Sequence, residues 1–340
     1  MLYDLFKKAA FKMDAETAHN LTLKGLTLTH RRDKPHFAAP KVPSRPVEVM
    51  GLKFENPVGL AAGLDKNGDY VDALGGLGFG SIEIGTITPR PQPGNPKPRL
   101  FRIPEQEAII NRMGFNNKGV DYLVEQVKRC RFGGVLGINI GKNFDTPNEN
   151  ALEDYLKGMR AVYQFADYIT VNISSPNTQG LRDLQSGEAF EQLIAGLKQQ
   201  QNELAQSNGN HVPLAIKIAP DLSNEEITFM GQTMLQHKID AVIATNTTIR
   251  RDGLEQYEVA KETGGLSGYP VQDLSTTVIK KLKLVLEDEI PIIGVGGIMS
   301  AESAQAKFDA GAKLIQVYSG LVYRGPGIVS EIVKGLPEDL

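Results

Sequence analysis

The sequence has little cysteine, no long hydrophobic run and no strong excess of either charge. Its single cysteine, Cys130, excludes an intramolecular disulfide, a thiolate metal cluster and CxxC redox chemistry. No stretch approaches the ~18 consecutive apolar residues that a membrane-spanning helix requires. With 37 Lys and Arg against 40 Asp and Glu, the net charge of −3 provides no global basic surface for nucleic acid. A disulfide scaffold, a polytopic membrane protein and a strongly basic nucleic-acid binder are therefore excluded.

Length and composition indicate a soluble globular protein. The 340 residues fit one large domain with additions, or two ordinary domains. Hydrophobic residues make up 41% and charged residues 23%, which excludes wholesale disorder and a fibrous repeat. The charge is uneven, because residues 1–45 hold nine Lys and Arg against four Asp and Glu. We expect a mildly acidic body with a basic N-terminal attachment.

The N-terminal segment predicts two short amphipathic helices rather than a secretory signal. Charged residues such as Asp4, Lys7 and Lys12 interrupt every apolar run, so an h-region of ~7–15 residues is missing. Asp14 has the position of an N-cap for the second helix. Two interpretations stay open: a helical hairpin packed on its own domain, or an interfacial helix pair that contacts anionic lipid. Apolar residues recur at helical spacing at Leu2, Leu5, Phe6, Ala9, Ala10 and Met13, and then at Ala18, Leu21 and Leu28.

From residue 51 onward, short β-rich apolar runs alternate with helical segments. Near-continuous apolar strands separated by helices indicate a parallel sheet covered on its faces. Eight such units predict an α/β fold, a closed (β/α)8 TIM barrel, rather than an open doubly wound sheet. The predicted strands are 57–61, 79–86, 135–140, 168–173, 213–218, 241–245, 291–295 and 314–318. The predicted helices include 119–129, 151–165, 189–204, 224–237, 274–286 and 301–310.

A glycine-rich segment, 294–297, follows the seventh predicted strand. A dinucleotide fingerprint would need glycine at the position of Met299 and an early place in the chain, so that interpretation is rejected. In a barrel, the loop after strand seven commonly contributes to a phosphate site. Backbone amides of 296–297 and 318–320, with a helix expected to start near Ser300, are therefore predicted to hold a phosphate.

Polar side chains gather at the C-terminal ends of the predicted strands, where barrel enzymes carry their chemistry. One Asn at a strand end is often turn chemistry. Four successive strand ends with an amide or a lysine favour a site for a ring with carbonyl and N–H edges: Asn139, Asn172, Lys217 and Asn246. Lys217 is expected to stabilise negative charge on a reduced ring, with a barrel-interior salt bridge as the alternative. Together with the phosphate site this suggests FMN. No strand end carries His and no cluster has metal-ligand spacing, so neither a His triad nor a metal site is predicted.

The segment 172–185 supplies a candidate base. Ser174 and Ser175 begin a long loop that ends near Gly187 and could serve as a lid. A hydroxyl has a high intrinsic pKa, so it acts as a base only with help from its surroundings. The alternative is an ordinary turn or capping serine, which spacing alone would favour.

These segments together resemble the class 2 dihydroorotate dehydrogenases, the quinone-using FMN enzymes of pyrimidine synthesis. The resemblance covers essentially the whole chain. It is carried by GLAAGLDKNG (59–68), EIGTITPRPQPGNPKPRLFR (83–102), INRMGFNN (110–117), VNISSPNTQGLRDLQ (171–185), IKIAPDL (216–222), ATNTT (244–248), GGLSG (264–268), GVGGI (294–298) and QVYSGLVYRGP (316–326).

The resemblance implies the site residues. It implies Ser175 as the base, whereas the class 1 branch has cysteine there and Cys130 lies in a predicted helix. His19 and Arg102 match positions near the family's quinone passage. Implied FMN contacts are Ala62, Gly63, Thr86, Asn139, Asn172, Lys217, Thr245, Gly268, Gly297, Tyr318 and Ser319. Implied dihydroorotate contacts are Lys66, Asn111, Met113, Gly114, Phe115, Asn172, Asn177, Asn246 and Thr247.

The resemblance also implies an activity and a location. Ser175 would remove the C5 proton of (S)-dihydroorotate while a hydride leaves C6 for flavin N5, and a membrane quinone would then reoxidise the flavin. Residues 1–45 would form the helical extension at the quinone entrance with its linker, and 46–340 the FMN-binding barrel. The expected protein is a monomer, peripheral to the cytoplasmic face of the inner membrane, with no nucleic-acid partner. Rival interpretations are a tRNA dihydrouridine synthase and a membrane-tethered flavin-binding protein without turnover.

Overall fold

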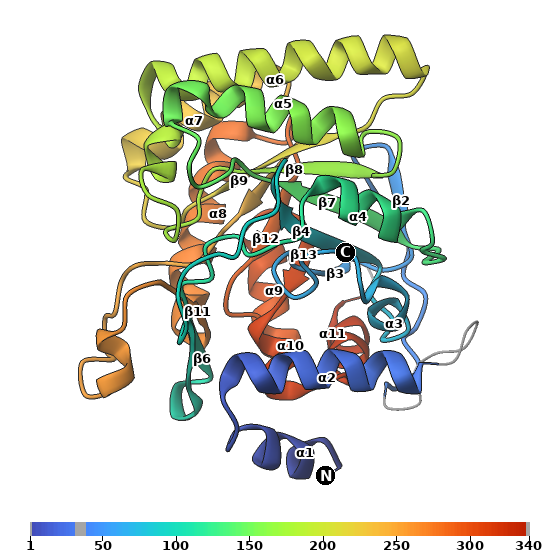
Figure 1. Cartoon of the computed structure of the whole chain (residues 1–340), viewed down its shortest axis with the longest axis vertical. Helices are drawn as coiled ribbons and strands as arrows, with labels where there is room; N and C mark the ends of the chain where they lie inside the picture. The colour runs from blue at the N-terminus through green and yellow to red at the C-terminus, as the bar shows by residue number, and fades with distance from the viewer. Residues whose placement is uncertain (1, 31–38, 338–340) are drawn as a thin grey trace.

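The computed structural model describes residues 2–30 and 39–337, and a closed eight-stranded parallel barrel forms its centre (Figure 1). Neighbouring strands follow chain order around the barrel, and the last pairs with the first. The predicted fold is confirmed, since each predicted apolar run overlaps one barrel strand. Parts of the predicted N-terminal extension and of the C-terminal end, at 1, 31–38 and 338–340, lie outside the described residues. The strands are β3 (Val58–Leu60), β4 (Ser81–Ile87), β7 (Val135–Ile140), β8 (Tyr168–Asn172), β9 (Leu214–Ile218), β10 (Ala241–Ala244), β12 (Ile292–Val295) and β13 (Ala312–Val317).

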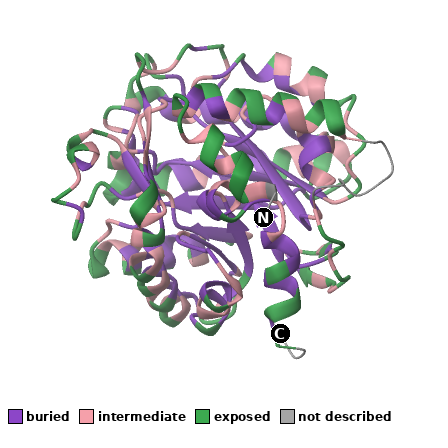
Figure 2. Ribbon diagram, turned by 90° about the horizontal axis from the view of Figure 1, so that it is seen from below, coloured by how far each residue is buried: buried purple, intermediate pink, exposed green. Residues whose placement is uncertain are grey.

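Helices cover the barrel, and the strands between them are buried (Figure 2). Their apolar faces pack on the outer side of the strands in one large cluster, while their outer faces carry charge. The Ser223 side chain and Glu226 form a capping box that fixes the start of α7. The covering helices are α3 (Val71–Gly75), α4 (Val120–Val127), α5 (Ala151–Val162), α6 (Gly187–Asn208), α7 (Asn224–Gln236), α8 (Gln272–Leu286), α9 (Ala301–Asp309), α10 (Ser319–Arg324) and α11 (Ile328–Gly335).

A hairpin of β1 (Val47–Val49) and β2 (Leu52–Phe54) precedes the barrel. Phe54, which is 1% exposed, joins the cluster of Val135 and Tyr168 from the barrel strands. Because these residues lie at the starts of their strands, the hairpin closes the N-terminal end of the barrel.

A second sheet stands over the opposite end of the barrel, and the sequence did not predict it. None of the predicted strands or helices falls in segment 88–118, but β5 (Leu100–Ile103) and β6 (Ala108–Asn111) form an antiparallel pair there. β11 (Gly265–Gly268) adds to β6 from far along the chain. Ile103, Ala108 and Leu266 form a small core of their own. Short 3-10 turns complete the loops: η1 (Pro104–Gln106), η2 (Asn148–Asn150), η3 (Leu181–Gln185), η4 (Glu258–Lys261) and η5 (Tyr269–Val271).

The N-terminal helices α1 (Leu2–Ala10) and α2 (Ala15–Thr29) lie together at one end of the molecule, next to α10 and α11 (Figure 1). The Asp14 side chain accepts from the Thr17 amide at 2.8 Å, which confirms the predicted N-cap. The Tyr3 hydroxyl donates to the Val322 carbonyl at 2.7 Å and ties α1 to α10. The pair therefore packs on its own domain. Within the described residues, every helix is too short or too polar to cross a bilayer.

Candidate active site

One cavity lies between the C-terminal ends of the barrel strands and the sheet of β5, β6 and β11. It is lined by residues of the strand ends and of the loops that follow them, and such a concave site is where a ligand is expected to bind. The structure brings nearly all predicted site residues to this cavity. From the predicted substrate and base set, Lys66, Asn111, Met113, Gly114, Phe115, Asn172, Ser175, Asn177, Asn246 and Thr247 line it. From the predicted cofactor set, Ala62, Gly63, Thr86, Lys217, Thr245, Gly268, Gly297, Tyr318 and Ser319 line it.

Asn139 is the exception among the predicted cofactor residues. Its side chain is fully buried behind Thr86, whose hydroxyl donates to Asn139 Oδ1 at 2.6 Å. Asn172 Nδ2 in turn donates to the same Thr86 hydroxyl at 2.9 Å. Asn139 therefore orients the side chains that face the cavity, and its own contact with a cofactor stays a prediction.

Sequence reasoning missed several lining residues. Ser267 and Val271 come from β11 and the turn after it, whose place over the barrel depends on a pairing that the sequence does not display. The Ser267 and Ser319 hydroxyls lie 2.9 Å apart. Gln316 lines the cavity because β13 points its side chain inward, which the alternation along that strand could have shown. The others missed are Ala61, Val295 and Ile298.

A buried carboxylate, Glu83 on β4, occupies the barrel interior beneath the cavity. Its side chain has no exposed surface, and Lys217 Nζ on β9 lies 3.8 Å from Glu83 Oε1. Two sequence interpretations of Lys217 were opposed, an interior salt bridge and a site lysine. Both hold geometrically, because Lys217 pairs with Glu83 and also lines the cavity.

Neutral donors surround the remaining edges of that carboxylate. Glu83 Oε2 accepts from Tyr168 at 3.0 Å, from Thr170 at 3.1 Å and from Gln316 at 2.8 Å. Glu83 Oε1 accepts from Asn139 Nδ2 at 2.8 Å. Burial and the Glu83 charge raise the pKa of Tyr168 well above its ordinary value, which keeps its hydroxyl a donor. The carboxylate is thus fully hydrogen-bonded, as a buried charge requires.

Lys66 stands at the other side of the cavity, in the loop after β3. Its ammonium donates to the Gly63 carbonyl at 2.8 Å. Burial lowers the pKa of Lys66 to about 8, with Glu16 acting in the opposite direction. At neutral pH the side chain is therefore mostly charged and can receive a carboxylate from a ligand.

Four asparagines from separate elements form the polar wall of the cavity. Asn177 Nδ2 donates to Asn111 Oδ1 at 3.1 Å, and Asn246 Nδ2 donates to Asn172 Oδ1 at 3.2 Å. Asn177 Oδ1 and Thr247 Oγ1 are buried and have no hydrogen-bond partner within the described residues. Unpaired buried polar atoms are costly, so these two atoms indicate where a ligand with polar edges would bind.

Ser175 lines the cavity in the loop after β8 and is 6% exposed. Its Oγ accepts from the Asn177 amide at 3.2 Å. Arg182, which sequence reasoning did not single out, fixes this loop: Nε donates to the Ser174 carbonyl at 3.0 Å, and the guanidinium donates to the Thr247 carbonyl at 2.8 Å. The ion pair of Arg182 with Asp221, at 2.7 Å, completes the anchor. Ser175 is thereby held at the wall of the cavity.

The predicted phosphate cradle is corrected in one detail. A helix, α9, does start after its N-cap Ser300 as expected, but Ser300 does not line the cavity. The helix that begins at the cavity is α10, through Ser319 and Gly320. The Gly297 amide donates to no group in the described part of the chain. At Gly297 φ is +71°, and a Cβ there would lie 2.5 Å from the Gln272 Cα, so only glycine fits this turn.

His19 and Arg102 lie outside the cavity. Burial, with the Lys66 charge nearby, lowers the pKa of His19 to about 3, so the imidazole is neutral at physiological pH. The Arg102 guanidinium donates to the Ala10 carbonyl at 3.3 Å and to the Met13 carbonyl. It also lies 4.6 Å from the centre of the Phe11 ring. Arg102 therefore fastens the end of α1, and a role for either residue toward quinone stays a prediction.

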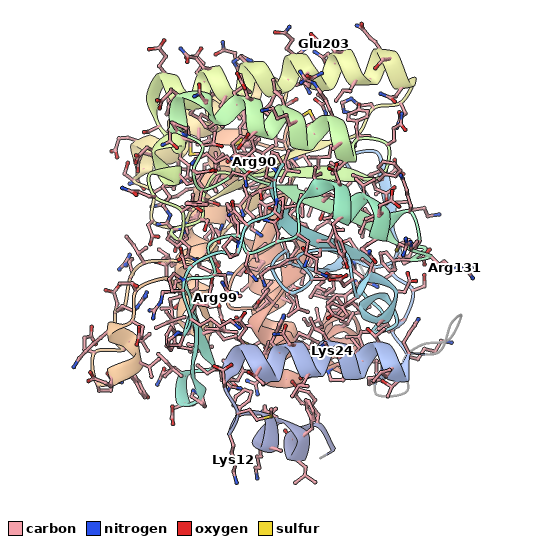
Figure 3. All side chains as sticks on the ribbon, viewed as in Figure 1. Lys12, Lys24, Arg90, Arg99, Arg131 and Glu203 are labelled. Atoms are coloured by element: carbon pink, nitrogen blue, oxygen red, sulfur yellow. The ribbon has the colours of Figure 1, made fainter. Side chains whose placement is uncertain are left out.

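A buried ion pair connects α2 with the loop beside the cavity. Arg99 donates to Glu16 through NH2 at 2.8 Å and through Nε at 3.1 Å, and both residues are 7% exposed. Figure 3 shows Arg99 close to the start of α2. Arg99 NH1 also donates to the Asn95 carbonyl at 2.8 Å, and Asn95 Nδ2 donates to the Asn177 carbonyl at 3.3 Å. A continuous set of hydrogen bonds thus runs from α2 to a residue that lines the cavity.

In the part of the chain that the structure describes, no group of three or more His, Cys, Asp or Glu is arranged to hold a metal ion. Lys66, Lys217 and Tyr318 are the ionisable side chains that line the cavity, and burial raises the pKa of Tyr318 to about 12. The cavity therefore offers cations, amides and a hydroxyl to its ligand.

Comparison with known proteins agrees with this geometry. The family model described as dihydroorotate dehydrogenase matches residues 45–340. A dihydroorotate dehydrogenase (quinone) of Dechloromonas aromatica is 59% identical over 339 residues, covering 99% of this chain and 98% of that protein. One of Cellvibrio japonicus is 58% identical over 335 residues, covering 98% of each. A crystal structure of the enzyme from Eimeria tenella in complex with ferulenol has a TM-score of 0.86 at 37% identity, covering 94% of this chain and 90% of that one. The chain belongs to the dihydroorotate dehydrogenase family, in its quinone-dependent class.

Proposed function

We propose that this protein oxidises (S)-dihydroorotate to orotate with FMN in the cavity and a membrane quinone as final acceptor, a step of pyrimidine biosynthesis. The observation that carries the proposal is the meeting of Lys66, Lys217, Ser175 and the asparagine wall in one cavity at the C-terminal end of the barrel.

The residues present fit FMN. The Gly297 amide and the first amides of α10 would hold the phosphate, since they are unpaired and the glycine permits close approach. Lys217 would lie near the pyrimidine edge of the flavin ring, where its charge offsets negative charge. When bound, FMN supplies a two-electron acceptor that can pass the electrons on singly. The remaining contacts would be Ala62, Gly63, Thr86, Asn139, Asn172, Thr245, Gly268, Tyr318 and Ser319.

The opposite half of the cavity would hold dihydroorotate. The Lys66 ammonium would bind the carboxylate, and the asparagine amides would bind the N–H and carbonyl edges of the ring. Asn177 Oδ1 and Thr247 Oγ1 would thereby gain the partners they lack. Ser175 Oγ would take the proton from C5 of the substrate as the hydride leaves C6. Met113, Gly114 and Phe115 would close the cavity over the ring and exclude water.

Residues 1–45 would form a membrane-docking extension, and 46–340 the catalytic domain. Support comes from the apolar side chains that α1 and α2 leave exposed, with Leu5 at 69%, Leu21 at 53% and Leu28 at 87%. Lys12 and Lys24 lie on the same two-helix layer (Figure 3). Quinone would approach between these helices, past His19 and Arg102, at the cytoplasmic face of the inner membrane. The enzyme would act as a monomer without a nucleic-acid partner.

A spectrum of the purified protein tests this function. Flavin absorbance should bleach when dihydroorotate is added without oxygen, and a quinone should restore it. A tRNA dihydrouridine synthase would not bleach with dihydroorotate, and a flavin-binding protein without turnover would show flavin that neither substrate changes. Absence of flavin, or flavin indifferent to dihydroorotate, would refute the proposal.

A further inference from the structure

Lys307 on α9 is a fully buried amine outside the lining of the cavity. We propose that Lys307 is a positioning residue for the cofactor phosphate: it supplies a buried positive charge behind the Gly296–Gly297 turn and holds that turn in place. This inference rests on the proposed FMN site, and it concerns a residue that would not touch the cofactor.

The ammonium of Lys307 has three neutral acceptors, all in the first turn of α8. It donates to the Gln272 carbonyl at 2.8 Å, to Thr276 Oγ1 at 2.7 Å and to Ser275 Oγ. Lys307 itself is 0% exposed. Three acceptors match the three donors of an ammonium group.

Two contacts join this ammonium to the turn that lines the cavity. Ser275 Oγ, which accepts from Lys307, lies 3.1 Å from the carbonyl oxygens of both Gly296 and Gln272 and can donate its one hydrogen to either. Gly297 packs on Gln272 so closely that a Cβ would lie 2.6 Å from the Gln272 amide nitrogen. The same α8 turn that binds Lys307 thus supports both glycines of the cradle.

The charge of Lys307 is not neutralised by a neighbouring acid. No carboxylate lies within 4 Å of its ammonium in residues 2–30 and 39–337. Asp273, whose charge acts on it from farther away, is exposed to solvent. Burial lowers the pKa of Lys307 to about 7, so a nearby anion would favour the charged form.

A bound phosphate would provide that anion. A phosphate monoester carries ≈ −1.5 to −2 charge at pH 7, and it would lie on the far side of the Gly296–Gly297 turn. A buried unpaired cation is costly, whereas a cation opposite a phosphate in a region of low dielectric contributes to binding. The contribution depends on the phosphate alone and not on the isoalloxazine ring.

The experiment compares FMN with riboflavin, which has the ring but no phosphate. Full-length apoprotein is titrated with each flavin, and the ratio of the two dissociation constants measures what the phosphate contributes. Lys307→Met, which keeps the length of the side chain, should reduce the preference for FMN by at least on the order of tenfold. Its affinity for riboflavin should stay close to that of the unmodified protein, and Lys307→Arg should retain most of the preference.

Several outcomes decide the matter. If Lys307→Met lost affinity for FMN and for riboflavin equally, Lys307 would have only a structural role, and the proposal would be overturned. An unchanged preference for FMN over riboflavin would overturn it as well. If Lys307→Met does not fold, Lys307→Gln keeps a donor for the Gln272 carbonyl and carries the same expectation. Lys313→Met removes a half-exposed lysine of β13 and is the matched control. If the unmodified protein itself does not prefer FMN to riboflavin, the proposed cofactor site fails rather than the role of Lys307.

Discussion

Lys217 and Glu83 form a buried ion pair in the barrel, with Nζ and Oε1 3.8 Å apart. The carboxylate has four neutral donors besides, whereas the ammonium has no hydrogen-bond partner among the residues described. The Glu83 carboxylate is therefore enclosed by protein, and the Lys217 ammonium faces the cavity. Substrate chemistry would meet a cation whose counter-charge is fixed beneath it.

Because the two charges are paired, we expect the effects of Lys217→Met and Glu83→Gln on the free energy of unfolding to be strongly non-additive. Lys217→Met leaves Glu83 without a cation within 4 Å and should lower the free energy of unfolding of the apoprotein by ~3–5 kcal/mol. Adding Glu83→Gln should recover part of that loss, because the unpaired buried charge disappears. Denaturant unfolding of the two single variants and the double variant measures the coupling. Additive losses would mean that the two charges do not interact.

Ser175→Ala should leave FMN bound and slow the reduction of flavin by dihydroorotate by ~10²–10⁴-fold. The hydroxyl would no longer take the C5 proton, while the lysines and amides proposed to bind cofactor and substrate remain. Stopped-flow bleaching without oxygen measures the rate. Ser186→Ala, an exposed serine at the end of the same loop, is the control and should reduce at the unmodified rate. If Ser175→Ala bleached at the rate of the unmodified protein, Ser175 would not be the base.

The lowered pKa of Lys66, about 8, predicts how orotate affinity depends on pH. Well below pH 8 the amine is charged and would pair with the ligand carboxylate. Above pH 8 the charged fraction falls about tenfold per pH unit, so the dissociation constant of orotate should rise in proportion until the neutral form dominates binding. Titrations followed by the flavin spectrum from pH 6 to pH 10 test this. Lys66→Arg should abolish the rise, since a guanidinium stays charged throughout. A dissociation constant that is flat to pH 10 in the unmodified protein would contradict the assignment.

Leu5→Glu and Leu21→Glu should each weaken binding to anionic lipid vesicles by on the order of tenfold, because each replaces an exposed leucine that would enter the lipid interface with a charge that anionic lipid repels. Vesicle co-sedimentation measures the binding. Leu284→Glu on α8 is a matched control, since Leu284 is 80% exposed and lies on another helix layer. All three variants should bleach with dihydroorotate as the unmodified protein does. Equal vesicle binding by Leu5→Glu, Leu21→Glu and Leu284→Glu would place the membrane contact elsewhere.

The barrel could be predicted because each strand is a short apolar run, with polar residues, glycine or proline at its end or within the next few residues. Val135–Ile140, followed by a helix with regular apolar spacing, is an example. The sheet of β5, β6 and β11 could not, because each strand has only four residues and Gly265 pairs with Asn111 far back in the chain. Pairings over such a separation leave no local pattern.

The same distinction holds for the site. Residues on motif-bearing loops, such as Ser175 and Asn246, were predicted and do line the cavity. In the sequence, Glu83 is a single charged residue within an apolar strand. Its position in the barrel interior can be inferred only once it is known which side of the strand faces inward. In the sequence, Lys307 looks like an ordinary charged residue on an amphipathic helix. The α8 carbonyl that accepts a hydrogen bond from its ammonium is far away in the sequence. Arg182 likewise gains its importance from carbonyls on two other segments.

The Glu16–Arg99 pair means that the helical extension is not a detachable anchor. Removal of α2 would leave the 7% exposed Arg99 guanidinium without its carboxylate, and the same guanidinium holds the loop whose Asn95 binds the backbone of Asn177. We therefore expect truncation of the extension to change the affinity for the substrate as well as any binding to lipid. An amphiphile that displaces α2 should, for the same reason, weaken dihydroorotate binding without entering the cavity, so the chemistry of the cavity can be altered from the α2 face.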